Sequence, residues 1–290
     1  MKTIIIAEIG ECFNGDMDQA RKLIVTAKAA GCDYAKFQTL DREGIAEDDP
    51  EREWFLKVAL QKEQLTQLQS WCRDAGIGFL CTPENKKKAE ELKELGCREV
   101  KIASTCAWDD ELVSYISEHF SIIFVSTGLS TLEEVDKVVS RLKKQEKIYL
   151  MHCVSEYPTG PLLTQRGLQA LSHENVNLRM MDILKERYPH CVVGYSDHTV
   201  DIIVPVVAVA RGAGVIEKHI TLDRKGPVNL FLSKRGYSGT DHVLSLEPDE
   251  LKEMVRQIRE TEKILGEAVW QRSPGEKILM DFLKGRFSNP

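Results

Sequence analysis

The sequence predicts an α/β fold, a single (β/α)8 TIM barrel, from three observations. Short apolar, β-branched segments alternate with amphipathic helical segments, which is typical of parallel βα units. The chain has 290 residues, and one such barrel uses about 250. Polar residues follow the apolar segments, as expected at the rim where barrels of this kind place their chemistry. Eight strands are predicted: Thr3–Ala7, Tyr34–Phe37, Gly78–Cys81, Glu99–Ile102, Ser121–Val125, Ile148–His152, Cys191–Gly194 and Gly214–Glu217.

The segments between the strands have helical periodicity. After the first strand, apolar residues recur at spacings of three and four, namely Ala20, Leu23, Ile24 and Ala27. The acidic segment Asp41–Glu53 is predicted to be a long loop after the second strand. Further along, Ser130-Thr131-Leu132-Glu133 has a capping-box pattern, which predicts the start of a helix. The inward face of that helix is expected to hold Val135, Val138, Val139 and Leu142.

The last helices define the predicted limits of the domain. Pro205 lies early in the segment between the seventh and eighth strands, where a first-turn proline is tolerated. A helix beginning near Pro248 is expected to direct inward Leu251, Met254, Val255, Ile258 and Leu265. We therefore predict a TIM-barrel domain over residues 1–266 and a C-terminal helical tail over residues 267–290, which contains a short amphipathic piece.

Composition excludes several classes of protein. A net charge of −6 offers no basic surface for nucleic acid or for an anionic membrane. No segment approaches the roughly 20 apolar residues of a membrane span, and the apolar run after Met1 is too short for a signal peptide. The eight cysteines are scattered without a Cys-x-x-Cys pair. We therefore expect reduced thiols and a cytoplasmic protein.

Two histidines lie just past the last two predicted strands. His198 lies in Gly194–Thr199 and His219 in Ile216–Thr221, with one helix-length segment between them. Adjacent parallel strands would place both imidazoles at the same rim. Two neutral imidazoles that face one pocket are suitable ligands for a divalent metal with open positions. The alternative is a pair of hydrogen-bonded rim histidines without a metal.

Two lysines lie within the predicted strands. Lys36 and Lys101 each stand between two apolar residues. Because a buried ammonium without an anion is costly, we expect an anionic ligand, and the hydroxyls at other strand ends suit a phosphate. Glu8, at the end of the first strand, is a candidate acid, base or metal-linked carboxylate; the alternative is a salt bridge to one of the lysines. A glycine-rich loop is expected to present Asp241 to the rim.

These residues belong to a longer series of segments that occur in order along the chain. The series is Ala7–Gly10, Lys36–Gln38, Thr82-Pro83, Lys101–Ser104, Ser126–Gly128, His152-Cys153, Tyr157-Pro158, Gly194–Thr199, Glu217–Thr221 and Asp241. It resembles the catalytic barrel of the sialic acid (N-acetylneuraminate) synthase family, the phosphoenolpyruvate-dependent nonulosonic acid synthases. The resemblance implies a transferase that condenses phosphoenolpyruvate with a sugar aldehyde, an N-acyl hexosamine or related aldose. The products would be a sialic-acid-like 3-deoxy-2-keto acid and phosphate.

The resemblance also implies roles for individual residues. His198 and His219 would hold Mn²⁺ or Mg²⁺, which polarises the aldehyde of the open-chain sugar. Glu8 and Asp241 would manage the water that adds to carbon 2 and its protons. Lys101 would bind the carboxylate of phosphoenolpyruvate. The residues expected to bind its phosphate are Lys36, Thr82, Ser104, Ser126 and Ser196, and those expected to position the substrates are Gln38 and Tyr157.

The chain also departs from the family pattern. Cys12-Phe13 occupies the place of the usual Asn-His pair, and Cys106 that of a glutamate that contacts the sugar. The loop Arg224–Ser238 is longer than the usual connection. The sequence contains no counterpart of the family's C-terminal antifreeze-like domain, which crosses a dimer to cap the partner's pocket. The resemblance implies a homodimer, an expectation that the lack of this domain weakens. The pocket would then be closed by the loop Arg224–Ser238 or by a separate capping domain or protein.

Three functional hypotheses follow. The first is the phosphoenolpyruvate-dependent synthase, acting on an acceptor other than the commonest one. The second is another barrel reaction on a keto-acid or phosphate substrate, such as carbon–carbon cleavage by a lyase. The third is a non-catalytic homologue that has kept the phosphate pocket. Retention of both histidines, both lysines, Glu8 and Asp241 favours an enzyme over the third hypothesis.

Overall fold

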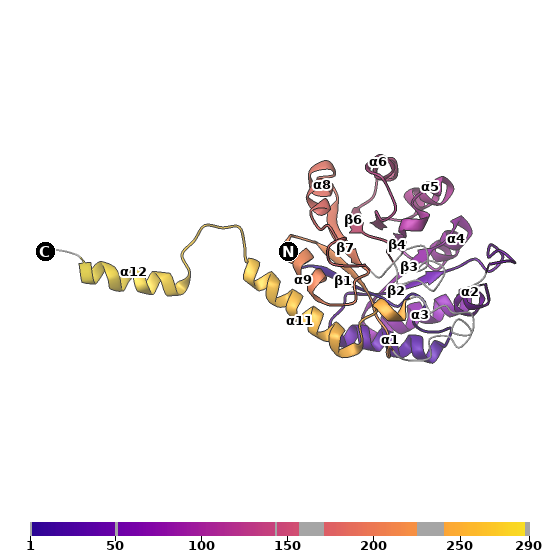
Figure 1. Cartoon of the computed structure of the whole chain (residues 1–290), viewed down its shortest axis with the longest axis horizontal. Coiled ribbons are helices and arrows are strands. Elements are labelled where there is room, and N and C mark those ends of the chain that lie inside the picture. Colours follow the sequence, from indigo (N-terminus) through magenta and orange to yellow (C-terminus); the bar gives the residue numbers. More distant parts are fainter. Residues whose placement is uncertain (1, 50–51, 143, 157–170, 225–240, 288–290) are drawn as a thin grey trace.

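The computed structural model describes the chain except for residues 1, 50–51, 143, 157–170, 225–240 and 288–290. Its parallel strands form a barrel surrounded by helices, which confirms the predicted (β/α)8 fold (Figure 1). The strands are β1 (Ile4–Glu8), β2 (Tyr34–Thr39), β3 (Gly78–Pro83), β4 (Glu99–Ile102), β5 (Ile122–Ser126), β6 (Lys147–Cys153), β7 (Val192–Asp197) and β8 (Val215–His219). Seven of the eight continue one to three residues beyond their predicted ends. Several polar residues of the candidate site therefore belong to strands, where backbone pairing holds them.

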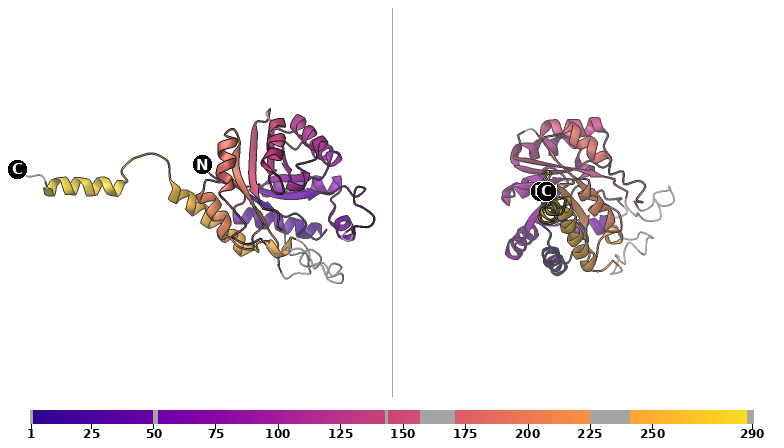
Figure 2. Two further views of the ribbon diagram at one scale, coloured as in Figure 1. Left: turned by 45° about the horizontal axis from the view of Figure 1, so that its top comes forward. Right: turned by 90° about the vertical axis from the view of Figure 1, so that its left-hand side faces the viewer.

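The sheet follows the order β3-β2-β1-β8-β7-β6-β5-β4, with hydrogen-bonded neighbours. The two ends of this order, β3 and β4, also lie against each other, which completes the barrel (Figures 1 and 2). In the β7–β8 pair, Ser196 stands opposite Glu217 and Asp197 opposite Lys218. This register brings the ends of β7 and β8, which carry the two predicted histidines, side by side at the C-terminal rim.

Helices enclose the barrel and follow the predicted pattern closely. They are α1 (Met17–Ala30), α2 (Arg52–Val58), α3 (Lys62–Ala75), α4 (Lys86–Glu94), α5 (Asp110–His119), α6 (Leu132–Arg141), α8 (Met180–Arg187), α9 (Ile203–Ala210) and α11 (Pro248–Leu265). The predicted apolar face of α1 is buried. Pro205 lies in the first turn of α9, as expected. Asp41–Glu53 is not a loop throughout, because α2 begins at Arg52.

Two details of the predicted helices are wrong. The capping box of α6 is formed by Thr131 and Glu134, one residue later than the predicted pattern. The Thr131 hydroxyl accepts a hydrogen bond from the Glu134 amide, and the Glu134 carboxylate accepts one from the Thr131 amide. In α11, Leu265 is 52% exposed, whereas the other predicted inward residues are buried. Leu265 is the last residue of α11, at the end from which the chain leaves the barrel (Figure 1).

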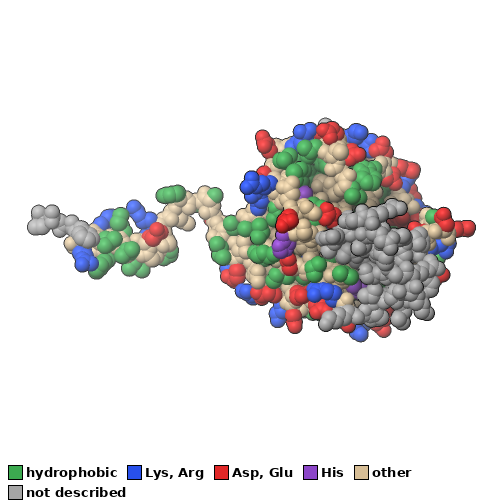
Figure 3. Space-filling model, in the orientation of Figure 1, with side chains coloured by type: hydrophobic (Ala, Val, Ile, Leu, Met, Phe, Trp, Pro, Cys, Tyr) green, Lys and Arg blue, Asp and Glu red, His purple; other side chains and the backbone are tan. Residues whose placement is uncertain are grey.

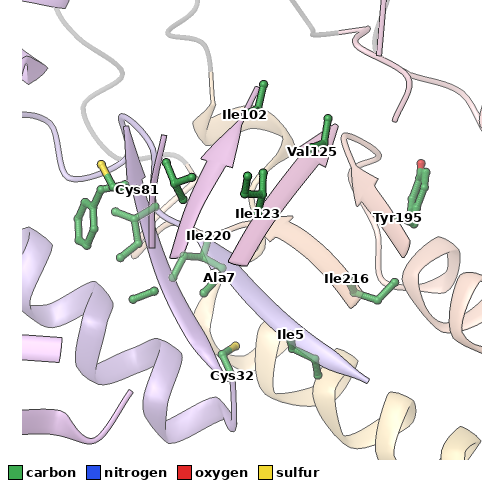
Figure 4. Close-up of a cluster of buried hydrophobic side chains, with 14 of the residues drawn as sticks. Ile5, Ala7, Cys32, Cys81, Ile102, Ile123, Val125, Tyr195, Ile216 and Ile220 are labelled. Atoms are coloured by element: carbon green, nitrogen blue, oxygen red, sulfur yellow. The ribbon is translucent and has the colours of Figure 1, made fainter. Parts of the chain in front are cut away.

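The apolar core has two parts separated by the strands. Inside the barrel, Ile6, Leu80, Phe124, Met151 and Val215 form a buried cluster. A larger cluster packs between the strands and the surrounding helices, and it includes strand residues that alternate with the lumen-facing ones (Figure 4). Because side chains alternate along a strand, β1, β3, β5, β6 and β8 contribute residues to both clusters. The lumen cluster is a packed plug on which the polar rim is built.

The last described helix, α12 (Pro274–Phe287), lies away from the barrel (Figures 1 and 2). Its apolar side chains Ile278, Leu279 and Phe282 are exposed, as is Trp270 in the connection before it (Figure 3). The predicted amphipathic piece is thus helical, while the division into a domain of residues 1–266 and a tail stays a prediction. Among the described residues, none of the helices is both long and apolar enough to cross a membrane.

Candidate active site

Polar side chains fill the lumen on the C-terminal side of the apolar plug. Residues two positions apart on a strand face the same side. Two positions beyond the plug residues stand Glu8, Thr82, Ser126, Cys153 and Glu217. All of these side chains are buried, and so are Lys36 and Lys101, which are 3% and 1% exposed. The strand periodicity that builds the plug therefore also builds a charged layer directly above it.

Glu217 lies at the centre of this layer. Its Oε2 is 3.4 Å from the Lys36 Nζ, and its Oε1 is 3.6 Å from the Lys101 Nζ. The Ser196 hydroxyl donates a hydrogen bond to Glu217 Oε1 at 3.0 Å. Lys36 also pairs with Glu8 at 2.8 Å. Both predicted anion-binding lysines thus meet at the carboxylate of Glu217. The contact between Lys36 and Glu8 confirms the alternative interpretation of Glu8 as a salt-bridge partner.

The charges in this cluster depend on one another. Burial acts to raise the pKa of Glu217, but Lys101 and Lys36 outweigh it and hold that pKa below the ordinary value. Burial acts to lower the pKa of Lys36, but Glu217 and Glu8 outweigh it and raise that pKa. Burial dominates for Glu8, whose pKa is raised, and for Lys101, whose pKa is lowered. Glu217 and Lys36 are therefore charged, and of the two glutamates Glu8 is the one better able to take up a proton.

Hydroxyl groups surround the two lysines. Lys36 donates a hydrogen bond to the Thr82 hydroxyl at 3.3 Å, and Lys101 donates one to the Ser126 hydroxyl at 2.7 Å. Ser104 lies beside the turn after β5, because a Cβ at Gly128 would be 2.7 Å from its hydroxyl oxygen. The same Cβ would be 2.2 Å from the Ser155 hydroxyl. Glycine at position 128 therefore lets the backbone approach these hydroxyls as closely as an anion-binding turn requires.

Two carboxyl groups, those of Glu8 and Asp241, lie close together near Lys36. The Gln38 amide donates a hydrogen bond to Glu8 Oε1 at 2.8 Å. Gly10 has φ +48°, and a Cβ there would lie 2.9 Å from both Glu8 Oε1 and Asp241 Oδ2. Burial, together with Glu11 and Glu8, raises the pKa of Asp241 well above its ordinary value. The structure thus brings Glu8, Gln38 and Asp241 together around a turn that glycine tolerates best.

The two predicted histidines are neighbours at the rim. Their ring centroids are 5.4 Å apart, and Asp241 Oδ2 is 3.6 Å from His219 Nδ1. His198 donates a hydrogen bond from Nδ1 to the Val154 carbonyl at 2.8 Å, and the Cys153 Sγ is 3.8 Å from the same nitrogen. This hydrogen bond sets the orientation of the His198 ring.

The two imidazoles differ in protonation. Burial and the neighbouring His198 lower the pKa of His219 well below its ordinary value, so His219 is neutral. Burial also acts to lower the pKa of His198, but Cys153 outweighs it and raises that pKa to about 9. A metal at His198 would compete with this proton, since metal ligands bind as neutral imidazole.

The donor set suits a divalent metal in part. Two imidazoles and a neighbouring carboxylate are groups that bind Mn²⁺ and related ions. Within the described part of the chain, however, no three His, Cys, Asp or Glu side chains are arranged as a ligand set. A metal at the two histidines would need water or substrate in its other positions, as in open catalytic sites.

The residues that depart from the family pattern are buried. Cys12 lies 3.4 Å from the Ser245 hydroxyl, and Phe13 packs edge-on against Phe37 in the core outside the lumen. Cys106 is 8% exposed in a short 3-10 turn after β4. Burial raises the pKa of both thiols, which makes them poor nucleophiles. Phe13 thus serves the core and contributes no aromatic contact to the site.

The structure also shows which site residues the sequence analysis missed. Glu217 and Ser155 received no role, although Glu217 precedes His219 by two positions on β8 and so shares its face. That spacing alone could have identified Glu217. Ser155 follows β6 and could be recognised only from its approach to Gly128. Tyr157, which was expected to help position the substrates, lies outside the described residues.

The comparisons with known proteins agree with this geometry. The model of the NeuB family matches residues 23–270. The chain belongs to the NeuB family. A solved structure, described as N-acetylneuraminic acid (sialic acid) synthetase of Leptospira borgpetersenii in complex with citrate, is similar to this NeuB-family chain with a TM-score of 0.84 and 28% identity. The similarity covers 100% of this chain and 94% of the synthetase chain.

Curated relatives of this NeuB-family chain share about a third of its residues. The uncharacterized protein MJ1065 of Methanocaldococcus jannaschii is 37% identical over 96% of this chain and 74% of its own length. The N,N'-diacetyllegionaminic acid synthase of Campylobacter jejuni is 33% identical over 95% of this chain and 81% of its own length. A truncated 3-deoxy-D-arabino-heptulosonate 7-phosphate synthase of Thermotoga maritima, at 14% identity and a TM-score of 0.69, shows only that the fold is shared.

Proposed function

We propose that this NeuB-family chain is a transferase that condenses phosphoenolpyruvate with the aldehyde of an open-chain sugar. The acceptor class is an N-acyl hexosamine or a related aldose, and the products are a 3-deoxy-2-keto sugar acid and phosphate. One observation carries the proposal: two buried lysines and several hydroxyls converge above an apolar plug, beside a pair of rim histidines. The names of two relatives, the N,N'-diacetyllegionaminic acid synthase and the pseudaminic acid synthase of Campylobacter jejuni, support a product of this kind.

The charged layer suits the two anionic groups of phosphoenolpyruvate. Lys36, with the hydroxyls of Thr82, Ser104, Ser126 and Ser196, would bind the phosphate, because charge-assisted bonds and several donors favour a dianion. Lys101, on the neighbouring side of Glu217, would bind the carboxylate. Glu217 pairs with both lysines at 3.4 and 3.6 Å, whereas Lys36 lies 2.8 Å from Glu8, so the long contacts to Glu217 are the ones that an anion would most readily supplement. An incoming anion would therefore share the lysines with Glu217.

The proposed reaction balances without any further reactant except water. Carbon 3 of phosphoenolpyruvate forms a bond to the aldehyde carbon, and the aldehyde oxygen takes up a proton. Water then adds to carbon 2, and the carbon–oxygen bond to phosphate breaks. Glu8, whose pKa is raised by burial, would accept the proton of the attacking water. Asp241, whose pKa is raised well above its ordinary value, would hold a proton near the same turn.

A divalent metal, Mn²⁺ or Mg²⁺, would be held by His198 and His219. When bound, it would supply Lewis-acid polarisation of the aldehyde oxygen. Two features of the chain support this assignment. The hydrogen bond from His198 Nδ1 to the Val154 carbonyl is the kind of second contact that orients metal-binding imidazoles. Burial keeps His219 neutral, which is the form that binds a metal.

The experiment that tests the proposal measures phosphate release from phosphoenolpyruvate in the presence of Mn²⁺. The protein is incubated with a panel of aldoses and N-acylated hexosamines, and the products are analysed by mass spectrometry. We expect phosphate release that depends on the acceptor and a product heavier by a pyruvate unit. The Lys36→Met variant is the control for contaminating phosphatase. Folded, metal-loaded protein that releases no phosphate with any acceptor would overturn the proposal.

A further inference from the structure

A second buried lysine–carboxylate pair lies on the outer face of β7 and β8. Asp197 and Lys218 stand opposite each other in the parallel register, one residue before His198 and His219 respectively. Because side chains alternate along a strand, the histidines face the lumen and this pair faces the surrounding helices. Both side chains are 0% exposed. The pair is thus directly behind the two residues that would hold the metal.

The contacts of this pair form a closed network around one turn. Lys218 Nζ lies 2.6 Å from Asp197 Oδ2 and also donates a hydrogen bond to the Thr199 carbonyl. The Thr199 hydroxyl donates to both carboxylate oxygens of Asp197, at 3.0 and 2.8 Å. The Thr199 amide donates to Asp197 Oδ1 at 3.2 Å. Asp197 and Thr199 are the two neighbours of His198 in the chain, so the network holds His198 from both sides.

The network connects the two histidines mechanically. Lys218 belongs to β8 and precedes His219. Its hydrogen-bond partners, Asp197 and Thr199, flank His198 at the end of β7. A shift of one strand end relative to the other would break the bonds of Lys218. The pairing between β7 and β8 ends at Asp197 and Lys218, one residue short of His198. Lys218 extends that support to the turn in which His198 lies.

The chemistry of this position argues against a role in packing alone. The neighbouring outer positions, Ile216 and Ile220, are apolar members of the core (Figure 4). A buried ion pair is often no more stabilising than apolar residues of similar volume, while it specifies a geometry that apolar contacts leave less defined. We propose that Lys218 and Asp197 are positioning residues that fix His198 relative to His219. This inference rests on the proposed function, because it assumes that His198 and His219 are held at a fixed distance in order to bind a metal.

The experiment uses Co²⁺ as a spectroscopic probe of the full-length protein. Four proteins are compared: wild type, Lys218→Met, the double variant Asp197→Leu/Lys218→Met, and Lys88→Met. The last variant is a matched control, because Lys88 is also a buried lysine, 5% exposed, and pairs with Glu91 at 2.9 Å on α4. The measurements are the Co²⁺ dissociation constant from the visible absorption, the thermal midpoint, and hydrogen exchange of the amides after β7.

We expect Lys218→Met to weaken Co²⁺ binding by about 10-fold to 100-fold, the loss typical of partners that orient metal ligands. It should also speed amide exchange in the turn that contains His198. Lys88→Met should lower the thermal midpoint without either effect. The double variant should recover thermal stability, because no charge is left buried alone, yet keep the weak Co²⁺ binding. Full recovery of Co²⁺ affinity by the double variant would show a packing role only and would overturn the proposal.

Failure of this proposal can be distinguished from failure of the proposed function. If wild-type protein binds no Co²⁺, the metal assignment is wrong, and the exchange data decide the positioning role. Faster exchange after β7 in Lys218→Met, but not in Lys88→Met, would then support the positioning role. Unchanged exchange would overturn it. If wild-type protein binds Co²⁺ and Lys218→Met binds it equally well, the metal site stands and the positioning role is wrong.

Discussion

The inner and outer faces of the barrel wall carry lysine–carboxylate groups that differ in how completely they are satisfied. On the outer face, Lys218 and Asp197 are 2.6 Å apart, and the Thr199 hydroxyl donates hydrogen bonds to both carboxylate oxygens of Asp197. On the inner face, Lys36 lies 2.8 Å from Glu8, but Lys36 and Lys101 are 3.4 and 3.6 Å from Glu217, the carboxylate that they share. Charge-assisted bonds of full strength are about 2.7–2.9 Å long. The outer group is therefore a closed structural unit, whereas the inner group retains the capacity to bind a further anion.

The comparison teaches that burial of charge alone does not identify a binding site. Both groups are buried and both lie on strands that end at the same rim. The inner group differs because hydroxyls and a close backbone turn surround it, and because it stands at the top of a packed plug where a ligand can enter. The first three predictions below test this difference, and the fourth concerns an exposed ion pair outside the barrel wall; they follow in order of decreasing effect.

The largest effect is expected for His219→Ala. The inner face should lose metal binding and turnover together, because this residue would supply one of two metal-binding imidazoles. We expect turnover to fall by about a thousandfold, roughly 4 kcal/mol of transition-state stabilisation. Metal content by elemental analysis and phosphate release from phosphoenolpyruvate measure the two effects. Turnover that survives unchanged would contradict the metal assignment.

The next effect concerns the lysines of the inner face. Lys101→Met should lower kcat/KM for phosphoenolpyruvate by about 100-fold, since loss of one preorganised donor to a reacting anion typically has this size. The protein should remain folded, because a methionine fits a lumen that already contains Met151. Steady-state kinetics with varied phosphoenolpyruvate measure the loss. The variant Lys88→Met is the control, and an equal loss there would show that the effect is not specific.

A third prediction separates the two faces directly. Glu217→Gln should lower the free energy of unfolding by about 1–3 kcal/mol, because Lys101 and Lys36 lose a charged partner. Added inorganic phosphate should restore stability by binding to the same lysines. Asp197→Asn should also destabilise the protein, but phosphate should stabilise this variant only as much as it stabilises the wild type, because the inner lysines are unchanged and the outer network is closed. Urea unfolding with and without phosphate tests this; equal rescue of both variants would contradict the comparison.

The smallest effect belongs to an exposed ion pair. Arg187 and Tyr188, at the end of α8, donate hydrogen bonds to Asp136 on α6 and lower its pKa from 3.8 to about 2. The folded pKa lies below the unfolded one, so this stabilisation is present above pH 3.8 and is lost as the pH falls toward 2. Asp136→Asn should therefore melt slightly below wild type near neutral pH. The two melting temperatures should converge below pH 3.8; a constant difference would contradict the assignment.

Much of the fold could be predicted because barrel strands are short and apolar. All eight strands were recognised from their β-branched residues, and the buried face of α1 from its spacing. The strands continue beyond their predicted ends because polar residues such as Gln38 and Ser196 belong to them. The capping box was misplaced by one residue because Ser130 and Thr131 are both suitable N-caps, and only the hydrogen bonds select Thr131.

The candidate site was predicted less completely than the fold. Residue types and order along the chain were enough to indicate Glu8, Lys36, Lys101 and the two histidines. They could not reveal that Glu217 is shared by both lysines, because that depends on three strands far apart in sequence. Residue types and order also could not show that Asp197 and Lys218 face the outer wall and not the lumen, although both residues lie in segments that resemble the family pattern. Phe13, which occupies the place of a polar residue of the family pattern, packs in the core.

The sequence by itself determined the order of βα units, the identity of the rim residues and the family to which the chain belongs. These features follow from local patterns, since strand periodicity and residue chemistry are properties of neighbouring residues. Only the tertiary structure decided which charges meet, because pairing across the barrel depends on register and on strand alternation summed over the whole sheet. That is why Lys218 packs on the outer wall of the barrel while its neighbours, Glu217 and His219, face the lumen.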